Sequence, residues 1–176
     1  MQILEGNRPV IFLHLSANNG LVSRAIRWVT FSKFGHVDFL LPDGTLLGSH
    51  VTSGQGVQIR PYGYLDFTRI LVLAVEAPAF VIEAAKSQIG RPFDFTAFIN
   101  FGVQRDWQEP DSWFCAELVA WAFKQAGNDL FAPDADVWRI TPRDLTITPL
   151  AYKIYEGEPL PVGNLLQLCR TALPAR

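Results

Sequence analysis

The feature of this sequence that most constrains its fold is a long apolar run in the second half of the chain. Between Trp113 and Ala126 only three residues are polar: Glu117, Lys124 and Gln125. Asp111 and Ser112 precede the run and Gly127 follows it, and these residue types commonly start and end α-helices. A helix that is apolar on nearly all sides is buried rather than laid on a surface. The run therefore predicts a helix in the centre of the domain.

Short strands are expected to pack around this helix. Residues 9–16 are mostly apolar on both faces, which is typical of an interior strand. Pro42-Asp43-Gly44 predicts a hairpin turn between strands at 36–41 and 45–51. Further strands are expected at 57–60, 68–75 and within 146–155, and further helices at 21–31, 78–90, from 141 and at 164–172. In the first of these helices Leu21, Ile26, Trp28 and Val29 mark the apolar pattern, with Arg24 and Arg27 outside.

These patterns favour a single α+β domain over residues 1–176, in which a small antiparallel sheet or barrel packs on the buried helix. The chain is 49% hydrophobic and 18% charged, which suits an ordinary core. Its net charge of −2, without any run of lysine or arginine, argues against nucleic acid as a partner. With two cysteines and three histidines at no recognisable ligand spacing, we expect neither a metal nor a cofactor.

Membrane insertion and export are not expected either. The apolar runs are shorter than the roughly 20 residues that span a bilayer. The segment from Met1 to Arg8 does not have the pattern of a secretory signal. The expected location is the cytoplasm, and a protein released by lysis or by a dedicated secretion machine has the same pattern. The sequence predicts no oligomeric state.

Cys115 is the strongest chemical lead, because the expected cap places it in the first turn of the buried helix. Free N–H groups and the positive end of the helix dipole favour a thiolate there. The alternative is a core cysteine, since free cysteines are among the most buried residues. Cys169 has no cap signal and no histidine near it in sequence, so we expect no catalytic role for it. We expect two free thiols rather than a disulfide.

Two histidines lie where they could serve this thiol. His36 begins one arm of the predicted hairpin and His50 ends the other, and residues on one face of two paired strands lie close together. Such a cluster could provide the base and the orienting group that a nucleophile needs. Asp38 shares the face of His36 and either accepts a hydrogen bond from an imidazole or is solvated. His14 is expected to be a hydrogen-bonded core or edge histidine. Glu117 lies on another side of the helix from Cys115, which favours a structural role.

Four segments in this order resemble the YiiX/YebB-like branch of the NlpC/P60 superfamily. They are Leu21-Val-Ser-Arg-Ala-Ile-Arg-Trp28, Ser32-Lys-Phe-Gly-His-Val37, Gly56-Val-Gln-Ile-Arg-Pro61 and Phe114-Cys-Ala-Glu-Leu-Val119. Members of this bacterial and phage branch are circularly permuted papain-like cysteine hydrolases, in which the histidine precedes the cysteine. The resemblance covers about Val10 to Leu145. It implies a permuted papain-like fold for the single domain.

The resemblance also implies roles for individual residues. Cys115 falls on the nucleophile and His36 on the general base, and the backbone N–H of Cys115 is expected in the oxyanion hole. The third polar position falls on His50. Asp38 stands where the family has a small or apolar residue, and the family's third position in this branch is often acidic or amide-bearing. The orienting residue is therefore left open between His50 and Asp38.

The implied activity is cleavage of an amide bond through an acyl-enzyme, with cell-wall peptides as the first substrate class. Permuted relatives also act on lipid acyl groups, so a thioesterase or lipid amidase is the near alternative. The segment from Phe93 to Phe101 is rich in phenylalanine and suits either an acyl groove or the core. A non-catalytic binding module that keeps the fold is the remaining alternative. The expected partner is a peptide or acyl substrate.

Overall fold

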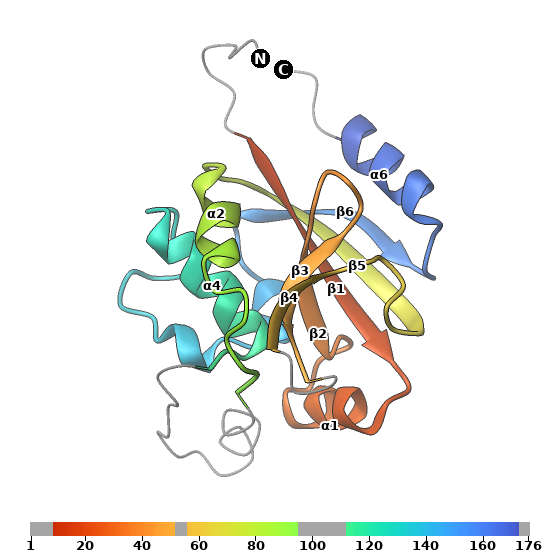
Figure 1. The fold of residues 1–176 in the computed structure, drawn as a ribbon, viewed down its shortest axis with the longest axis horizontal. Coiled ribbons are helices and arrows are strands. Elements are labelled where there is room, and N and C mark those ends of the chain that lie inside the picture. Colours follow the sequence, from red (N-terminus) through yellow and green to blue (C-terminus); the bar gives the residue numbers. More distant parts are fainter. Residues whose placement is uncertain (1–8, 52–55, 95–111, 173–176) are drawn as a thin grey trace.

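The computed structural model describes residues 9–51, 56–94 and 112–172. These residues form one six-stranded antiparallel sheet with the strand order β4-β3-β2-β1-β5-β6 (Figure 1). The strands are β1 (Val10–Asn18), β2 (His36–Leu40), β3 (Leu46–His50), β4 (Gly56–Arg60), β5 (Phe67–Glu76) and β6 (Ala151–Gly157). The helices are α1 (Leu21–Val29), α2 (Phe80–Lys86), α4 (Cys115–Gln125), α5 (Pro142–Leu145) and α6 (Val162–Thr171), with a 3₁₀ turn at Val137–Arg139. The predicted α+β class is confirmed.

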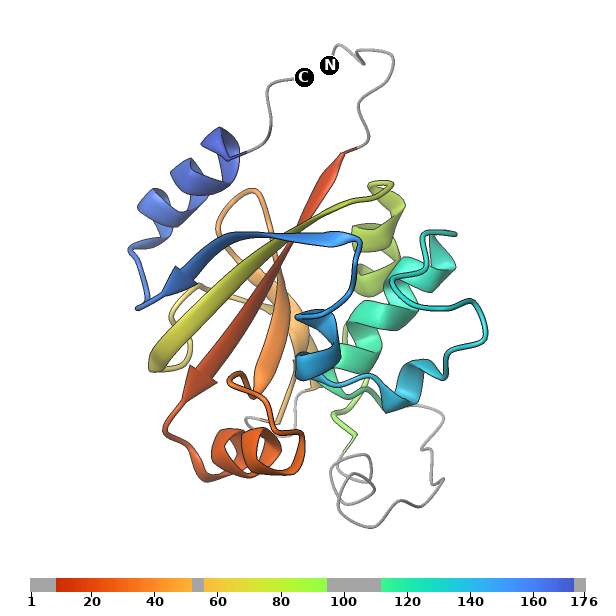
Figure 2. The same cartoon turned by 180° about the vertical axis from the view of Figure 1, so that it is seen from behind.

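β1 lies in the middle of the sheet, paired with β2 on one side and β5 on the other. This position explains why its sequence is apolar on both faces, because each face is covered by a helix layer. Figures 1 and 2 show α2 and α4 over one face and α6 over the other. Two buried clusters correspond to these layers, a large one that includes α4 and a smaller one that includes α6.

α4 is buried, as its sequence predicts. Eight of its residues are buried, and the ring of Phe123 stacks on that of Phe39 in β2 at 6.3 Å between centroids. The predicted cap by Ser112 is wrong, because the residue before the helix is Phe114. Asp111, the other expected cap, lies outside the described residues. The prediction that Cys115 lies in the first turn is confirmed, since the helix begins with it.

α1 differs from its expected orientation. Ile26 is buried, but Leu21 and Trp28 are 81% and 79% exposed. Arg27 is half-buried and donates to the carbonyl of Asn18 at 3.2 Å, so it is tied to the end of β1 rather than free in solvent. α2 is also shorter than the expected 78–90, since the helix covers only Phe80–Lys86 and residues 87–90 form turns. None of the helices in the described part of the chain is long and apolar enough to cross a membrane.

His14 is buried in β1, as predicted, but its hydrogen bonds are not satisfied. Its ring packs against the rings of Tyr62 and Phe67 at 5.4 and 5.0 Å. Neither of its ring nitrogens has a hydrogen-bond partner within the described structure. Burial therefore lowers the pKa of His14 to about 4, despite the attraction of the Asp38 carboxylate. The folded protein holds this imidazole neutral at a pH where an unfolded chain protonates it.

We expect this group to weaken the fold in acid. The pKa of His14 is 6.5 in the unfolded chain and about 4 in the folded protein, so between these pH values only the unfolded chain is protonated there. Replacing His14 with leucine should therefore stabilise the protein more at pH 5 than at pH 7.5, by roughly 2 kcal/mol. Urea unfolding of both proteins at both pH values measures the difference. An equal effect of His14→Leu at the two pH values would contradict a neutral buried imidazole.

Candidate active site

Cys115 is almost fully buried and lines the inner end of a pocket. As the first residue of α4, its N–H has no partner inside the helix and lies at the positive end of the dipole. Glu117 accepts the N–H of Phe114 at 3.2 Å, so this acid serves the helix start and not the thiol, as the sequence predicts. Burial raises the pKa of Glu117 to about 7. Glu117 thus closes the start of the helix, next to the Cys115 thiol.

His36 begins β2 directly after Gly35. Because Gly35 has no side chain, α1 can pack closely against it. The N–H of Gly35 donates to the carbonyl of Ser16 at 2.9 Å, which continues the pairing with β1. A Cβ on Gly35 would meet the Oγ and carbonyl oxygen of Ser23 at 2.7 and 2.8 Å. Glycine therefore allows the first turns of α1 to pack against the residue that precedes His36. The helix becomes a wall of the pocket that contains the imidazole.

The imidazole of His36 is held by two polar groups at one nitrogen. Its Nε2 lies 2.9 Å from Oδ1 of Asp38 and 3.0 Å from the hydroxyl of Tyr64. That hydroxyl also donates to Oδ2 of Asp38 at 3.2 Å. Oδ1 has no well-aligned hydrogen bond within the described structure, so its contact with Nε2 is one of charge rather than of hydrogen-bond geometry. The three groups form a closed triangle.

A local opening of the sheet makes room for this triangle. β1 pairs with β2 as far as His36, whereas the β2–β3 register covers only Phe39↔Leu47 and Leu40↔Leu46. The Asp38 carboxylate faces β3 at Gly48, where a Cβ would overlap Oδ1. Glycine at position 48 is therefore required sterically by the carboxylate and not by backbone conformation. The charged pair occupies a gap between two strands.

The buried charges of His36 and Asp38 stabilise each other. Burial opposes a charge on His36, but the Asp38 carboxylate and then the Cys115 sulfur outweigh it and raise the pKa of His36 to about 10. Burial would likewise raise the pKa of Asp38, yet the imidazolium of His36 holds that pKa below its ordinary value. The site at neutral pH therefore contains an imidazolium between a carboxylate and a sulfur.

His50 lies beside His36, as the hairpin predicts. The two rings meet edge to face with 4.8 Å between centroids, and the ring of Tyr64 lies 5.5 Å from that of His50. Burial, followed by the charge on His36, lowers the pKa of His50 to about 3, so this ring is neutral. Both candidate orienters thus contact His36, but the short polar contacts to Nε2 come from Asp38 and Tyr64.

Tyr64 is the residue that sequence reasoning missed. It lies between β4 and β5, after Gly63, whose φ of +84° turns the chain back across the sheet. The guanidinium of Arg60 lies 5.4 Å from the Tyr64 ring centroid and donates to the carbonyls of Gly48 and Gly56 at 3.0 and 2.7 Å. Burial raises the pKa of Tyr64, so its hydroxyl stays protonated and able to donate. A buried tyrosine hydroxyl needs a partner, but the sequence does not indicate which.

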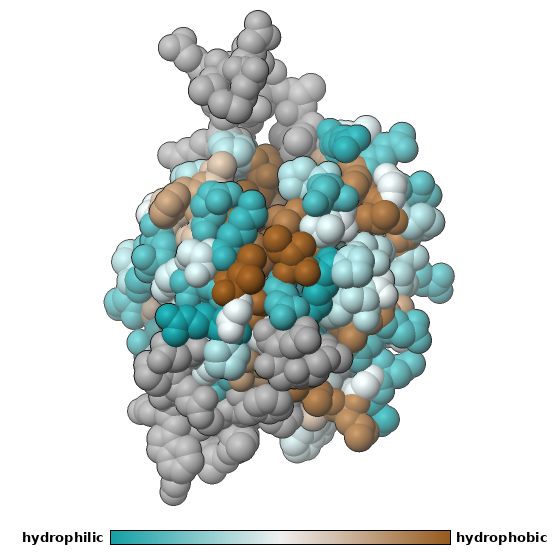
Figure 3. Space-filling view, in the orientation of Figure 1, coloured by the Kyte–Doolittle hydropathy of each residue, from teal (hydrophilic) through white to brown (hydrophobic). Residues whose placement is uncertain are grey.

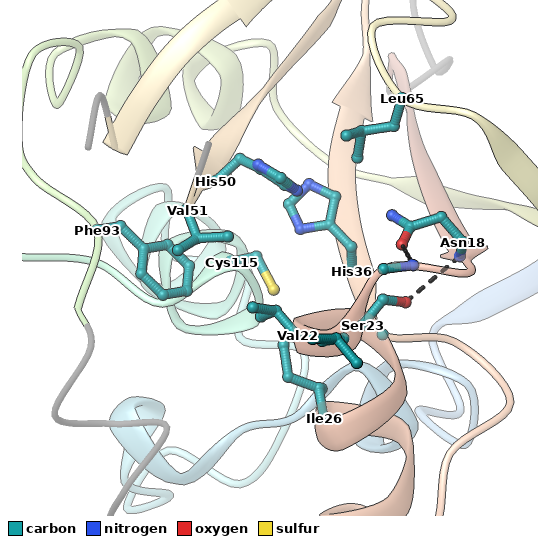
Figure 4. Close-up of a pocket in the computed structure, with 13 residues that line it drawn as sticks. Asn18, Val22, Ser23, Ile26, His36, His50, Val51, Leu65, Phe93 and Cys115 are labelled. Carbon is teal, nitrogen blue, oxygen red and sulfur yellow. Dashed lines mark hydrogen bonds between the residues drawn. The ribbon is translucent and has the colours of Figure 1, made fainter. Parts of the chain in front are cut away.

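The pocket in front of these groups has a volume of about 300 Å³ (Figure 4). In the close-up, the thiol of Cys115 and the imidazole of His36 point into the same space. Its apolar walls come from α1, β3 and the segments beside them: Leu21, Val22, Ile26, Val51, Leu65 and Phe93. Most of the phenylalanine-rich segment expected near the site, residues 95–101, lies outside the described residues.

The remaining candidates do not join the site. Cys169 is buried in α6 among the smaller cluster, and burial raises the pKa of its thiol to about 11. Both cysteines are free thiols. Among the residues that the structure describes, no group of three or more His, Cys, Asp or Glu side chains is arranged to hold a metal ion.

No protein-family model matches this sequence, and no curated protein matches it. Among solved structures, the fold is similar to the crystal structure of metalloprotein yiiX (DUF1105) from Escherichia coli O157:H7. The two share 15% sequence identity with a TM-score of 0.63, and the likeness covers 87% of this chain and 99% of that one. At this identity the likeness shows a shared fold, which extends over nearly the whole of the neighbour.

The gap at Gly48 provides a direct test of the charged triangle. Gly48→Ala should push the Asp38 carboxylate away from Nε2, because the new methyl group overlaps Oδ1. The pKa of His36 should then fall by about 1–3 units toward its ordinary value. NMR titration of the His36 imidazole measures this. Gly163→Ala on α6, where a methyl group meets nothing within 4 Å, is the control. A folded Gly48→Ala protein with an unchanged His36 titration would contradict the arrangement.

Proposed function

We propose that this protein is a cysteine hydrolase of the permuted papain-like type, with Cys115 as nucleophile and His36 as general acid and base. The observation that carries the proposal is the buried imidazole of His36, which lies 2.9 Å from the Asp38 carboxylate and points into the same space as the Cys115 thiol. The order along the chain supports the permutation, because the histidine strand β2 precedes the cysteine helix α4. The yiiX-like fold is consistent with this class.

The reaction follows from the charges. Nε2 of His36 is engaged by Asp38 and Tyr64, which leaves Nδ1 to serve the thiol. The Cys115 thiolate attacks the substrate carbonyl, and the backbone N–H at the start of α4 stabilises the oxyanion. His36 gives its proton to the leaving group as the C–N or C–S bond breaks, which leaves a thioester on Cys115. The neutral imidazole then takes a proton from water, the hydroxide attacks the thioester, and the acid leaves with the thiolate and imidazolium restored.

We assign the orienting role to Asp38, with Tyr64 as a positioning residue that fixes its carboxylate. Asp38 contacts Nε2 at 2.9 Å and compensates the imidazolium, whereas His50 is neutral and meets the His36 ring edge to face. His50 and Tyr64 limit how far that ring can turn. The histidine orienter implied by the family resemblance thus becomes the second choice.

No metal ion enters the proposed steps, although the structural neighbour is described as a metalloprotein. The short polar contacts of His36 Nε2 are with the Asp38 carboxylate and the Tyr64 hydroxyl. The described residues also lack a three-donor group around it. The donor set of this site fits an ion pair and not a coordination sphere.

The first substrate class is a peptide amide, as in bacterial cell walls. The second candidate is an acyl amide or thioester, and the walls of the pocket favour it. Leu21, Val22 and Ile26 of α1, with Val51 and Phe93 opposite, offer an apolar surface suited to a hydrocarbon chain. A non-catalytic binding module would not need a charged histidine beside the thiol.

Thiol reactivity tests the catalytic proposal. Iodoacetamide should alkylate Cys115 rapidly at pH 6, because the imidazolium of His36 favours the thiolate. His36→Ala should slow alkylation by about 10–100-fold. Mass spectrometry of the labelled peptide measures the rate, and Cys115→Ser shows the background from Cys169. Labelling at the rate of an ordinary thiol, unaffected by His36→Ala, would contradict the catalytic role of Cys115.

The same assay tests the orienting residue. Asp38→Asn should also slow alkylation, and a larger effect of His50→Ala would assign the orienting role to His50.

Separate cleavage assays distinguish the two substrate classes. Murein peptides and long-chain acyl thioesters are incubated separately with the protein, and released amine, acid or thiol is measured. Cleavage of murein peptides supports the first class, whereas cleavage of acyl thioesters alone replaces it with the second. Cys115→Ser should abolish either activity, since no other thiol lines the described part of the pocket.

A further inference from the structure

α1 and the turn after it expose large apolar side chains beside the pocket. Leu21, Trp28 and Phe31 are 81%, 79% and 83% exposed. Leu21 and Trp28 are seven residues apart, so they lie on one face of the helix. The hydropathy surface in Figure 3 shows apolar atoms gathered at the lower end of the molecule, where Figure 1 places α1. Scattered apolar residues on a surface are ordinary, but three large side chains grouped on one short element indicate an interaction site.

The backbone at Phe31 supports the same interpretation. Its φ of +51° is the only positive value at a non-glycine residue in the described chain. A bulky aromatic residue in this region is strained, at a cost on the order of 1–3 kcal/mol, and glycine would relieve the strain. The fold nevertheless keeps a phenylalanine there, and 83% of it faces solvent. Strain retained for an exposed ring suggests that the ring has a partner.

The charge around these side chains is positive. Residues 9–37 contain Arg24, Arg27 and Lys33 but no aspartate or glutamate, although the chain as a whole carries −2. Arg24 and Lys33 are exposed. Glu156 lies 4.0 Å from Lys33 and also contacts Arg69 and Lys153 at 3.1 Å. Three cations therefore surround this carboxylate.

We propose that α1 and its following turn dock on an anionic lipid surface. Trp28, Phe31 and Leu21 enter the boundary between headgroups and acyl chains, while Arg24 and Lys33 meet the phosphates. Tryptophan next to basic residues is typical of such interfaces. A stable protein partner buries about 800 Å² on each side, and three projecting side chains on one short helix and the turn after it suit shallow insertion better.

Docking in this way bears on the substrate, in a step that rests on the proposed hydrolase function. The first turn of α1 presents Leu21 to the outside, while Val22, Ser23 and Ile26 line the Cys115 pocket with it. A lipid surface held against α1 would therefore lie next to the pocket mouth. The substrate class that fits is an amide or thioester of a long acyl chain, drawn from the lipid surface into the apolar pocket.

Vesicle co-sedimentation tests the docking. We expect the protein to bind vesicles of phosphatidylcholine with phosphatidylglycerol, to bind pure phosphatidylcholine at least tenfold more weakly, and to dissociate in high salt. The double variant Trp28→Ser/Phe31→Ser should lose at least tenfold in binding, and Arg24→Glu/Lys33→Glu should lose the preference for anionic vesicles. Phe80→Ser, which removes a 58% exposed aromatic from α2, is the matched control. No binding to anionic vesicles, or binding that survives the Trp28/Phe31 change, overturns the proposal.

Two further measurements keep the outcomes separate. Sedimentation velocity without lipid shows whether the chain forms dimers, and a dimer broken by Trp28→Ser would assign the surface to a second copy and overturn lipid docking. Cys115→Ser should bind vesicles like the native protein, because docking needs no thiol. Loss of docking therefore leaves the thiol chemistry standing, and an unreactive Cys115 leaves docking standing.

Discussion

The contact between His36 and Asp38 is the interaction on which the rest of the site depends. Both groups are buried, and a buried charge is tolerated only when it is paired. Breaking such a pair by removing one partner costs about 3–5 kcal/mol. Gly48 leaves room for the carboxylate, Tyr64 donates to its second oxygen, and the charge then sets the state of the imidazole that serves Cys115. The state of the thiol therefore depends on a series of contacts that begins where the Asp38 carboxylate of β2 meets Gly48 of β3.

The same pair explains why three histidines in one sheet have three different properties. One carboxylate can compensate one imidazolium, and His36 takes it at 2.9 Å. Burial, followed by the charge on His36, keeps His50 neutral, although the Asp38 carboxylate also attracts a proton to that ring. His14, the cross-strand neighbour of Asp38, packs against aromatic rings and stays neutral because burial outweighs the attraction of that carboxylate. Burial and the contacts with one carboxylate together decide the charge on each ring.

Much of this architecture could be predicted because it depends on local pattern. The apolar run of α4 had to be buried, and the hairpin had to bring His50 to His36. The start of α4 was misplaced because no side chain of the residue before the helix caps it. Instead, Glu117 accepts the backbone N–H of Phe114. An acid three residues after the cap position is a known signal of a helix start and could have indicated Phe114. Tyr64 could not be predicted, because its partners depend on how the β4–β5 connection folds back over the sheet.

α1 shows why the fold alone does not define the substrate. The likeness to yiiX at 15% identity shows a shared fold, but it gives no information about the side chains of the pocket walls. In α1 a narrow stripe, Ser23 and Ile26, is buried against the site, while Trp28 is exposed and Leu21 is exposed where it also lines the pocket. A helix with apolar residues on both sides can connect a pocket to an external phase. In the hydrolase proposed here, the groups around Cys115 determine which bond is broken, and α1 determines from which surroundings the substrate comes.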